Sequence, residues 1–204
     1  MSLHNYLITE GIATARRDAV GGIEGFCQQV PEQIHDLIDL TNKIGINIME
    51  IGFNAGHSSE VFLATNPSSS VTSFDIGTHF YVGVGKGFID KQFSGRHTLI
   101  IGDSTISVPT FIKKYNTVFD FIFIDGGHSY EVALSDLSNC FHLADTDTIV
   151  AMDDVMFNEA YSNPVTVGPT KVWDEFLKAG RIVEIGRKEY TSTGRGMAWG
   201  KYLK

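Results

Sequence analysis

The hydrophobic positions alternate between two patterns along most of the chain. Short runs of consecutive apolar residues are typical of strands buried on both faces, and apolar residues spaced three or four apart are typical of one helix face. The runs predict strands at 44–51, 71–74, 97–101, 118–124, 148–152, 181–185 and 196–201. The periodic segments predict helices at 31–44, 58–64, 107–115, 132–143 and 170–178.

A strand followed by a helix is the repeating unit until the last two strands, which follow each other directly. Parallel neighbours need a long crossover, whereas antiparallel neighbours need only a turn. We therefore predict an α/β fold with a doubly wound, Rossmann-like sheet of seven mostly parallel strands, closed by a C-terminal antiparallel hairpin. Residues 31–204 form this domain, and residues 1–30 form an N-terminal extension.

The segment 77–93 fits the alternation less well. Gly83, Gly85 and Gly87 lie in it among aromatic residues, and glycine is a poor helix former, so we expect a mobile loop or a weak helix that could act as a lid. Gly85 and Lys86 resemble the end of a phosphate-binding P-loop. Gly87 stands where that motif needs Ser or Thr, and Phe80 stands in place of its first glycine, so a P-loop is excluded.

Composition narrows the class of protein. The chain has 204 residues, 43% hydrophobic and 20% charged, which is the composition of one ordinary globular domain. A net charge of −8 argues against nucleic-acid binding, which depends on Lys and Arg. Neither a membrane span nor a signal peptide is recognisable, so we expect a cytoplasmic protein without a membrane partner. Cys27 and Cys140 have no spacing typical of a disulfide framework or a zinc site, and a small molecule is the favoured ligand.

The stretch from Glu50 to Ser58 organises the rest of the chain. Gly52 and Gly56 follow a predicted strand at the point where a helix begins. Glycine lets a ligand approach the main chain closely, and the first amides of a helix favour negative charge. The pattern predicts a nucleotide-like ligand, although two glycines alone also fit an ordinary turn between a strand and a helix.

Acidic residues end most of the predicted strands. Parallel sheets bind ligands at the carboxyl ends of their strands, so these side chains should converge. Crowded carboxylates are unfavourable unless they accept hydrogen bonds or bind a cation, which predicts a metal ion or a cationic ligand. Asp103 alone also fits a helix cap. The residues are Glu50, Asp75, Asp103, Asp125, Asp153 and Asp154.

With these motifs, the chain resembles class I S-adenosylmethionine-dependent methyltransferases from about residue 31 to residue 204. The segment from Glu50 to Gly56 matches the first motif of that family, Asp75 stands where its ribose-binding acid lies, and Gly102-Asp103-Ser104 resembles its adenine-side segment. The resemblance implies S-adenosylmethionine as cofactor. It implies cofactor contacts by Glu50, Gly52, Asn54, Gly56, His57, Ser58, Asp75, Asp103, Ser104 and Asp125.

Within the class, the segment 121–130 and the sequence Met152-Asp153-Asp154 are similar to metal-dependent O-methyltransferases that act on small molecules, particularly on sugars of antibiotics. This similarity implies Mg²⁺ held by Asp125, Asp153 and Asp154, with His128 as the base that deprotonates an acceptor hydroxyl. Lys86 or His57 are the alternative bases. The expected partner is a small-molecule hydroxyl acceptor, and a homo-oligomer is compatible with the sequence.

Two other functions remain open at this point. A nicotinamide-dependent oxidoreductase also places a glycine turn after its first strand, but its fingerprint G-x-G-x-x-G needs a middle glycine where Asn54 stands. A non-catalytic ligand-binding subunit can share the fold, because a fold alone does not establish chemistry. The acids together with His128 favour the enzyme.

Overall fold

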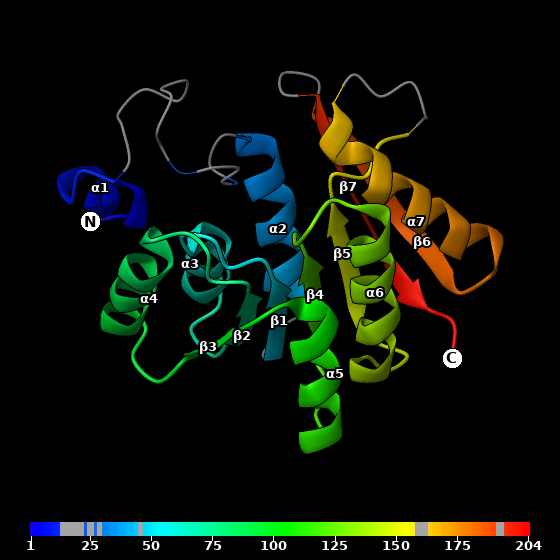
Figure 1. Ribbon diagram of the computed structural model, residues 1–204, viewed down its shortest axis with the longest axis horizontal. Coiled ribbons are helices and arrows are strands. Elements are labelled where there is room, and N and C mark those ends of the chain that lie inside the picture. The colour runs from blue at the N-terminus through cyan, green and yellow to red at the C-terminus, as the bar shows by residue number, and fades with distance from the viewer. Residues whose placement is uncertain (13–22, 24–26, 28–29, 45–46, 158–162, 191–193) are drawn as a thin grey trace.

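A seven-stranded sheet forms the centre of the protein, as the computed structural model shows for residues 1–12, 23, 27, 30–44, 47–157, 163–190 and 194–204 (Figure 1). The strand order is β3-β2-β1-β4-β5-β7-β6; β1 to β5 run parallel, and β7 pairs antiparallel with β5 and β6. The predicted fold class is therefore confirmed. The strands are β1 Asn47–Ile51, β2 Ser70–Asp75, β3 His97–Ile101, β4 Phe121–Ile124, β5 Ile149–Asp153, β6 Ile182–Tyr190 and β7 Arg195–Tyr202.

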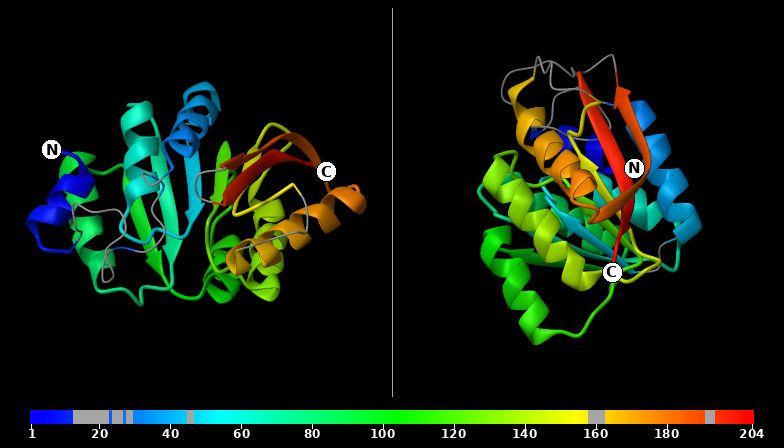
Figure 2. Two further views of the ribbon diagram at one scale, coloured as in Figure 1. Left: turned by 90° about the horizontal axis from the view of Figure 1, so that it is seen from above. Right: turned by 90° about the vertical axis from the view of Figure 1, so that its right-hand side faces the viewer.

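Helices cover both faces of the sheet, with α2 on one side and α5, α6 and α7 on the other (Figure 2). The contacts α2 with α3, α5 with α6, and α6 with α7 complete the two helical layers. None of the described helices has the length and apolar character that crossing a bilayer requires. The helices are α1 Leu3–Thr9, α2 Pro31–Ile44, α3 His57–Thr65, α4 Tyr81–Gln92, α5 Ser104–Lys114, α6 Tyr130–Cys140 and α7 Val167–Lys178, with short 3-10 turns at Phe141–Leu143 and Pro164–Thr166.

The central strands are buried on both faces, as their continuous apolar sequences predict. Successive side chains of a strand point to opposite faces, so Phe121 and Phe123 of β4 join the core under α1 to α4. Ile122 and Ile124 join the core under α5 to α7. The strand predicted at 118–124 begins only at Phe121, and Val118 is exposed.

Of the two alternatives for the segment 77–93, a mobile loop or a weak helix, the structure has the helix, because most of the segment forms α4. Its glycines disfavour a helix, but Tyr81, Val82, Phe88 and Ile89 are buried, and this packing outweighs the low intrinsic propensity. Gly85 is needed at its position: a Cβ there would lie 2.0 Å from the carbonyl oxygen of Ala55. Helix α4 therefore packs directly on the turn that follows β1.

Helix α1 lies within the N-terminal extension and was not predicted. Leu3 and Leu7 are completely buried, and the backbone amide of Leu3 donates to Glu60 Oε1 at 2.8 Å. Tyr6 stacks on Phe88 of α4. The described start of the extension thus packs onto α3 and α4 instead of standing apart from them.

Candidate active site

A pocket of about 330 Å³ opens at the carboxyl ends of the parallel strands, beside the point where the strand order reverses between β1 and β4. Of the candidate residues from the sequence, seven line it. They are Gly52, Asn54, Asp75, Asp103, Ser104, Asp125 and His128. Ile76, His79 and Arg195 also contribute to its wall and were not among the candidates.

The turn after β1 brings two parts of the pocket wall together. Gly52 has φ +98°, and a Cβ there would lie 1.9 Å from the carbonyl oxygen of Asp125, so only glycine allows this approach of the two turns. Asn54 has φ +53°, a left-handed conformation that Asn tolerates better than most residues. Gly56, with φ +93°, precedes the first turn of α3. These three residues with positive φ all lie in the segment that resembles the first motif of the methyltransferase family.

Asp75 fastens the end of β2 to this turn. Its Oδ2 accepts from the backbone amide of Asn54, and its Oδ1 accepts from the backbone amide of Gly77, both at 2.7 Å. A carboxylate has about four acceptor positions, so further donors can still bind. The predicted ribose-binding acid is therefore both oriented and able to accept from a ligand.

Asp103 caps α5, as its position after β3 suggested. Its Oδ1 accepts from the amide of Thr105 at 2.9 Å and from the Thr105 hydroxyl at 2.7 Å, and these bonds lower the pKa of Asp103. Asp103 and Ser104 nevertheless line the pocket. The capping role and the proposed adenine-side position are thus compatible.

Glu50 lies behind the pocket wall. It is completely buried and accepts from the hydroxyls of Ser58, Ser59 and Ser73, the last two at 2.5 Å. His97 Nε2 lies 2.9 Å from the Ser73 hydroxyl. Burial raises the pKa of Glu50, and the three hydroxyl donors oppose that rise. Glu50 therefore supports the turn and does not line the pocket.

His57 and Ser58 line a second, much smaller chamber. It shares Gly52, Asn54 and Asp125 with the main pocket, and Cys27 also borders it. His57 Nε2 lies 3.4 Å from Nδ1 of His4 in α1. Burial, with a smaller effect from His4, lowers the pKa of His57 to about 3, so this imidazole is neutral and poorly suited to accept a proton at neutral pH.

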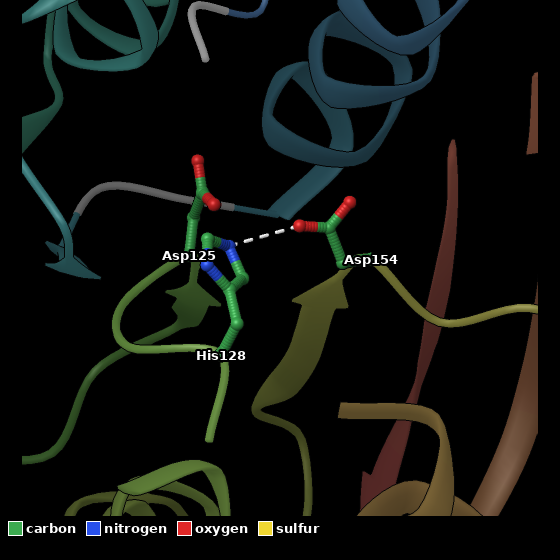
Figure 3. Close-up of side chains that lie close together, drawn as sticks. All are labelled: Asp125, His128 and Asp154. Carbon is green, nitrogen blue, oxygen red and sulfur yellow. Dashed lines mark ion pairs between the residues drawn. The ribbon is translucent and has the colours of Figure 1, made fainter. Parts of the chain in front are cut away.

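Asp125, His128 and Asp154 lie close together beyond the ends of β4 and β5 (Figure 3), and the first two line the pocket. One possible ligand atom from each residue lies within 4.8 Å of the others. His128 Nε2 lies 2.9 Å from Asp154 Oδ2. Asp154 follows β5 in a left-handed conformation with φ +60° and is fully buried, so its carboxylate is held firmly toward His128.

Asp153 lies apart from the cluster that contains its neighbour Asp154. Its Oδ1 accepts from Gln33 Nε2 of α2 at 2.6 Å, and among the described residues it is not part of the three-residue cluster. Burial, together with the adjacent Asp154 charge, raises the pKa of Asp153 to about 7. Asp125 shows the same direction, because burial and the charges of Asp153 and Asp154 raise its pKa. These acids favour a nearby positive charge.

Arg195, at the start of β7, supplies one such charge. Its Nε donates to Asp154 Oδ1 at 2.8 Å, and its Nη2 donates to Oδ2 at 3.0 Å. Although burial raises the pKa of Asp154, the bonds from His128 and Arg195 outweigh that effect and lower it overall. The sequence analysis missed Arg195 and Gln33, which lie far from the motifs along the chain.

The cluster suits a divalent cation in its donor set, because carboxylate oxygens are the ligands that Mg²⁺ prefers. Lys86, an alternative base from the sequence, pairs with Asp90 on α4 and does not line the pocket. His57 belongs to the smaller chamber. Of the three candidate bases, His128 is the one that lines the main pocket beside the acids.

Comparison with known proteins agrees with this geometry. A family model described as "Methyltransferase domain" matches residues 49–155. No curated protein matches the sequence.

Solved structures share the fold at low sequence identity. An O-methyltransferase from Bacillus cereus in complex with SAH has 18% identity and a TM-score of 0.74, covering 98% of this chain and 90% of its own. A cofactor-bound protein of MTB, Rv0187, has 17% identity and a TM-score of 0.74, with coverages of 98% and 88%. The apo structure of a TDP-rhamnose 3'-O-methyltransferase of calicheamicin biosynthesis has 21% identity and a TM-score of 0.62, with coverages of 85% and 78%.

Proposed function

Because the chain belongs to the methyltransferase-domain family and is an S-adenosylmethionine-dependent methyltransferase, we propose that it methylates a hydroxyl group of a small molecule. The observation that carries this proposal is the cluster of Asp125, His128 and Asp154 at the end of a pocket whose other end has Asp75 and Asp103. Membership of this family argues against an oxidoreductase, which Asn54 in place of the fingerprint's middle glycine already disfavoured.

The cofactor would occupy the main pocket, and bound S-adenosylmethionine supplies a methyl group on a positively charged sulfur. Asp75 would accept hydrogen bonds from the ribose hydroxyls, and the Asp103-Ser104 wall would border the adenine. The turn that carries His57 and Ser58 would face the methionine end. Gly52 and Asn54 border both chambers, which supports a ligand passing over this turn.

His128 is the proposed general base. When Nε2 carries the proton that faces Asp154 Oδ2, Nδ1 is the ring's acceptor for the hydroxyl proton of the substrate. Asp154 then orients the ring and stabilises the imidazolium that forms, as a carboxylate does in other base pairs of this kind. The His128 side chain is 38% exposed, which supports access by an acceptor.

Asp125 and Asp154 would hold Mg²⁺, with Asp153 beside them. A bound Mg²⁺ would acidify the acceptor hydroxyl and fix its orientation. Without the ion, the carboxylates of Asp125 and Asp154 still flank His128, so the proposed base lies at one end of the pocket. We propose a sugar or a sugar-containing metabolite as acceptor. This class is supported by the motif resemblance and by the shared fold of the TDP-rhamnose enzyme.

The test is methyl transfer by the purified protein. Sugar, catechol and polyketide hydroxyl compounds are incubated with S-adenosylmethionine, either with Mg²⁺ or after exhaustive chelation, and the methylated products are identified by mass spectrometry. We expect a sugar hydroxyl to be methylated and chelation to abolish turnover. Activity that survives chelation would disprove the metal role, and N-methylation alone would disprove the proposed reaction.

Replacing the base separates chemistry from cofactor binding. General-base catalysis contributes about 10²–10⁴-fold, so His128→Ala should lower kcat by that factor and leave cofactor affinity unchanged. His142→Ala is the matched control, because His142 is exposed on a short 3-10 turn and lines neither chamber. A near-normal kcat in His128→Ala would remove the base role.

A further inference from the structure

Arg195 lies against Asp154, one of the proposed metal ligands. Its guanidinium forms the paired bonds to both carboxylate oxygens of Asp154 that give Arg its strongest geometry with carboxylates. Among the described residues that line the main pocket, it is the only Lys or Arg. A divalent ion at this carboxylate would therefore meet a resident positive charge.

The sheet fixes this arrangement. β7 pairs antiparallel with β5, with Met197 opposite Asp153, so the start of β7 runs alongside the residues that follow β5. Arg195 is also paired with Tyr190 across the hairpin. Because its backbone pairs with β6 and its side chain is only 20% exposed, the guanidinium is restrained beside Asp154.

Arg195 and His128 meet at the same carboxylate. Asp154 Oδ2 is shared, since it lies 3.0 Å from Arg195 Nη2 and 2.9 Å from His128 Nε2. Any cation bound through this oxygen must displace part of that contact.

We propose that Arg195 is an internal cation that competes with the divalent ion for Asp154 and so keeps the metal affinity of the site low. The inference rests on the metal site of the proposed function. It assigns Arg195 a regulatory effect on metal occupancy: the site stays charge-balanced without metal, and a metal ion binds only when it outcompetes the guanidinium. Loss of the positive charge should therefore strengthen metal binding.

The test measures metal binding directly, without turnover. The full chain is titrated with Mn²⁺ or Mg²⁺ by calorimetry, in the absence of acceptor, for the natural protein, Arg195→Met and Arg195→Gln. We expect the two neutral variants to bind the ion about tenfold or more tightly. Arg195→Lys, which keeps a positive charge, should stay much nearer the natural affinity.

Arg187→Met is the matched control. Arg187 also donates to two acids, Asp174 and Glu184, but it lines neither chamber, so its loss should leave metal affinity unchanged. Unchanged or weaker binding in the neutral Arg195 variants would overturn the proposal and make Arg195 a support for Asp154. Arg195→Gln keeps side-chain donors for Asp154, so it decides the question if Arg195→Met does not fold.

The outcome is separable from that of the proposed function. If methyl transfer proves insensitive to chelation while the neutral variants still bind Mn²⁺ more tightly, the metal-assisted reaction fails and the competition stands. If neither the natural protein nor the variants bind either ion at millimolar concentration, the competition is refuted.

Discussion

Asp75→Ala tests how the end of β2 serves the cofactor. The substitution removes a carboxylate that accepts from two backbone amides, those of Asn54 and Gly77. It also removes the acceptor that we assign to the ribose. We expect a weaker affinity for S-adenosylmethionine and a lower free energy of unfolding, because the same side chain orders the turn and contacts the ligand.

The expected losses of cofactor affinity and of stability follow from the hydrogen bonds that Asp75 accepts. A hydrogen bond to a charged group contributes about 1.5–3 kcal/mol, and the partial exposure of Asp75 places it toward the lower end. Losing the ribose contacts should cost about 1–3 kcal/mol of binding, which corresponds to roughly a 5- to 150-fold rise in Kd. The loss of the two amide contacts should lower the free energy of unfolding by a similar amount.

Asp120→Ala is the control. Asp120 Oδ2 also accepts from a backbone amide, that of Asn47 at 2.8 Å, but at the opposite end of the sheet. Calorimetry of cofactor binding and urea unfolding are compared for both variants. Only Asp75→Ala should raise Kd. An unchanged Kd would exclude Asp75 from the cofactor site, and an equal rise in both variants would trace the effect to general loosening of the sheet.

Two further predictions concern the stability of the fold. Gly85→Ala should destabilise the protein by about 1–3 kcal/mol, because its Cβ would collide with the backbone of Ala55, whereas Gly87→Ala, with nothing within 4 Å of its Cβ, should stabilise it by about 0.5–1 kcal/mol in urea unfolding. A destabilised Gly87→Ala would contradict the helix seen at 81–92. Burial raises the pKa of Asp136 to about 7, so the folded state retains a proton that the unfolded chain releases above about pH 4, and stability falls as pH rises toward 7. In Asp136→Asn this loss of stability, which is at most about 1.4 kcal/mol per pH unit, should be absent. Melting temperatures that change in parallel in both proteins from pH 4 to 7 would refute the prediction.

The sequence predicted what local pattern determines. The continuous apolar runs of β1, β4 and β5 can be satisfied only by strands covered on both faces, and the direct succession of β6 and β7 predicted the hairpin. For the segment of α4, the sequence left a mobile loop and a weak helix open, because the glycine content does not reveal the buried aromatic face that stabilises the helix. Intrinsic propensity is a weak guide where tertiary packing decides.

The sequence predicted the site residues that lie at or just after the end of a buried strand. Asp75 ends β2, and Asp125 and His128 lie in the turn after β4, so the parallel sheet brings them to one edge. Gln33 and Arg195 reach Asp153 and Asp154 across sequence separations of 120 and 41 residues. No local pattern reports such contacts; only the antiparallel register of β7 with β5 could have suggested Arg195.

The two ends of the pocket are held by different forces. Around Asp75, the supporting donors are neutral backbone amides, whereas Asp154 is held by a guanidinium and an imidazole. Backbone donors keep their charge state at every pH, so the proposed cofactor end should retain its geometry wherever Asp75 is ionised. The acceptor end depends on a balance of charges among several buried acids, and that balance can change when a cation or an acceptor enters. A preformed cofactor site next to a charge-balanced acceptor site is the arrangement expected when the same cofactor binds in every cycle and the second end must respond to what it binds.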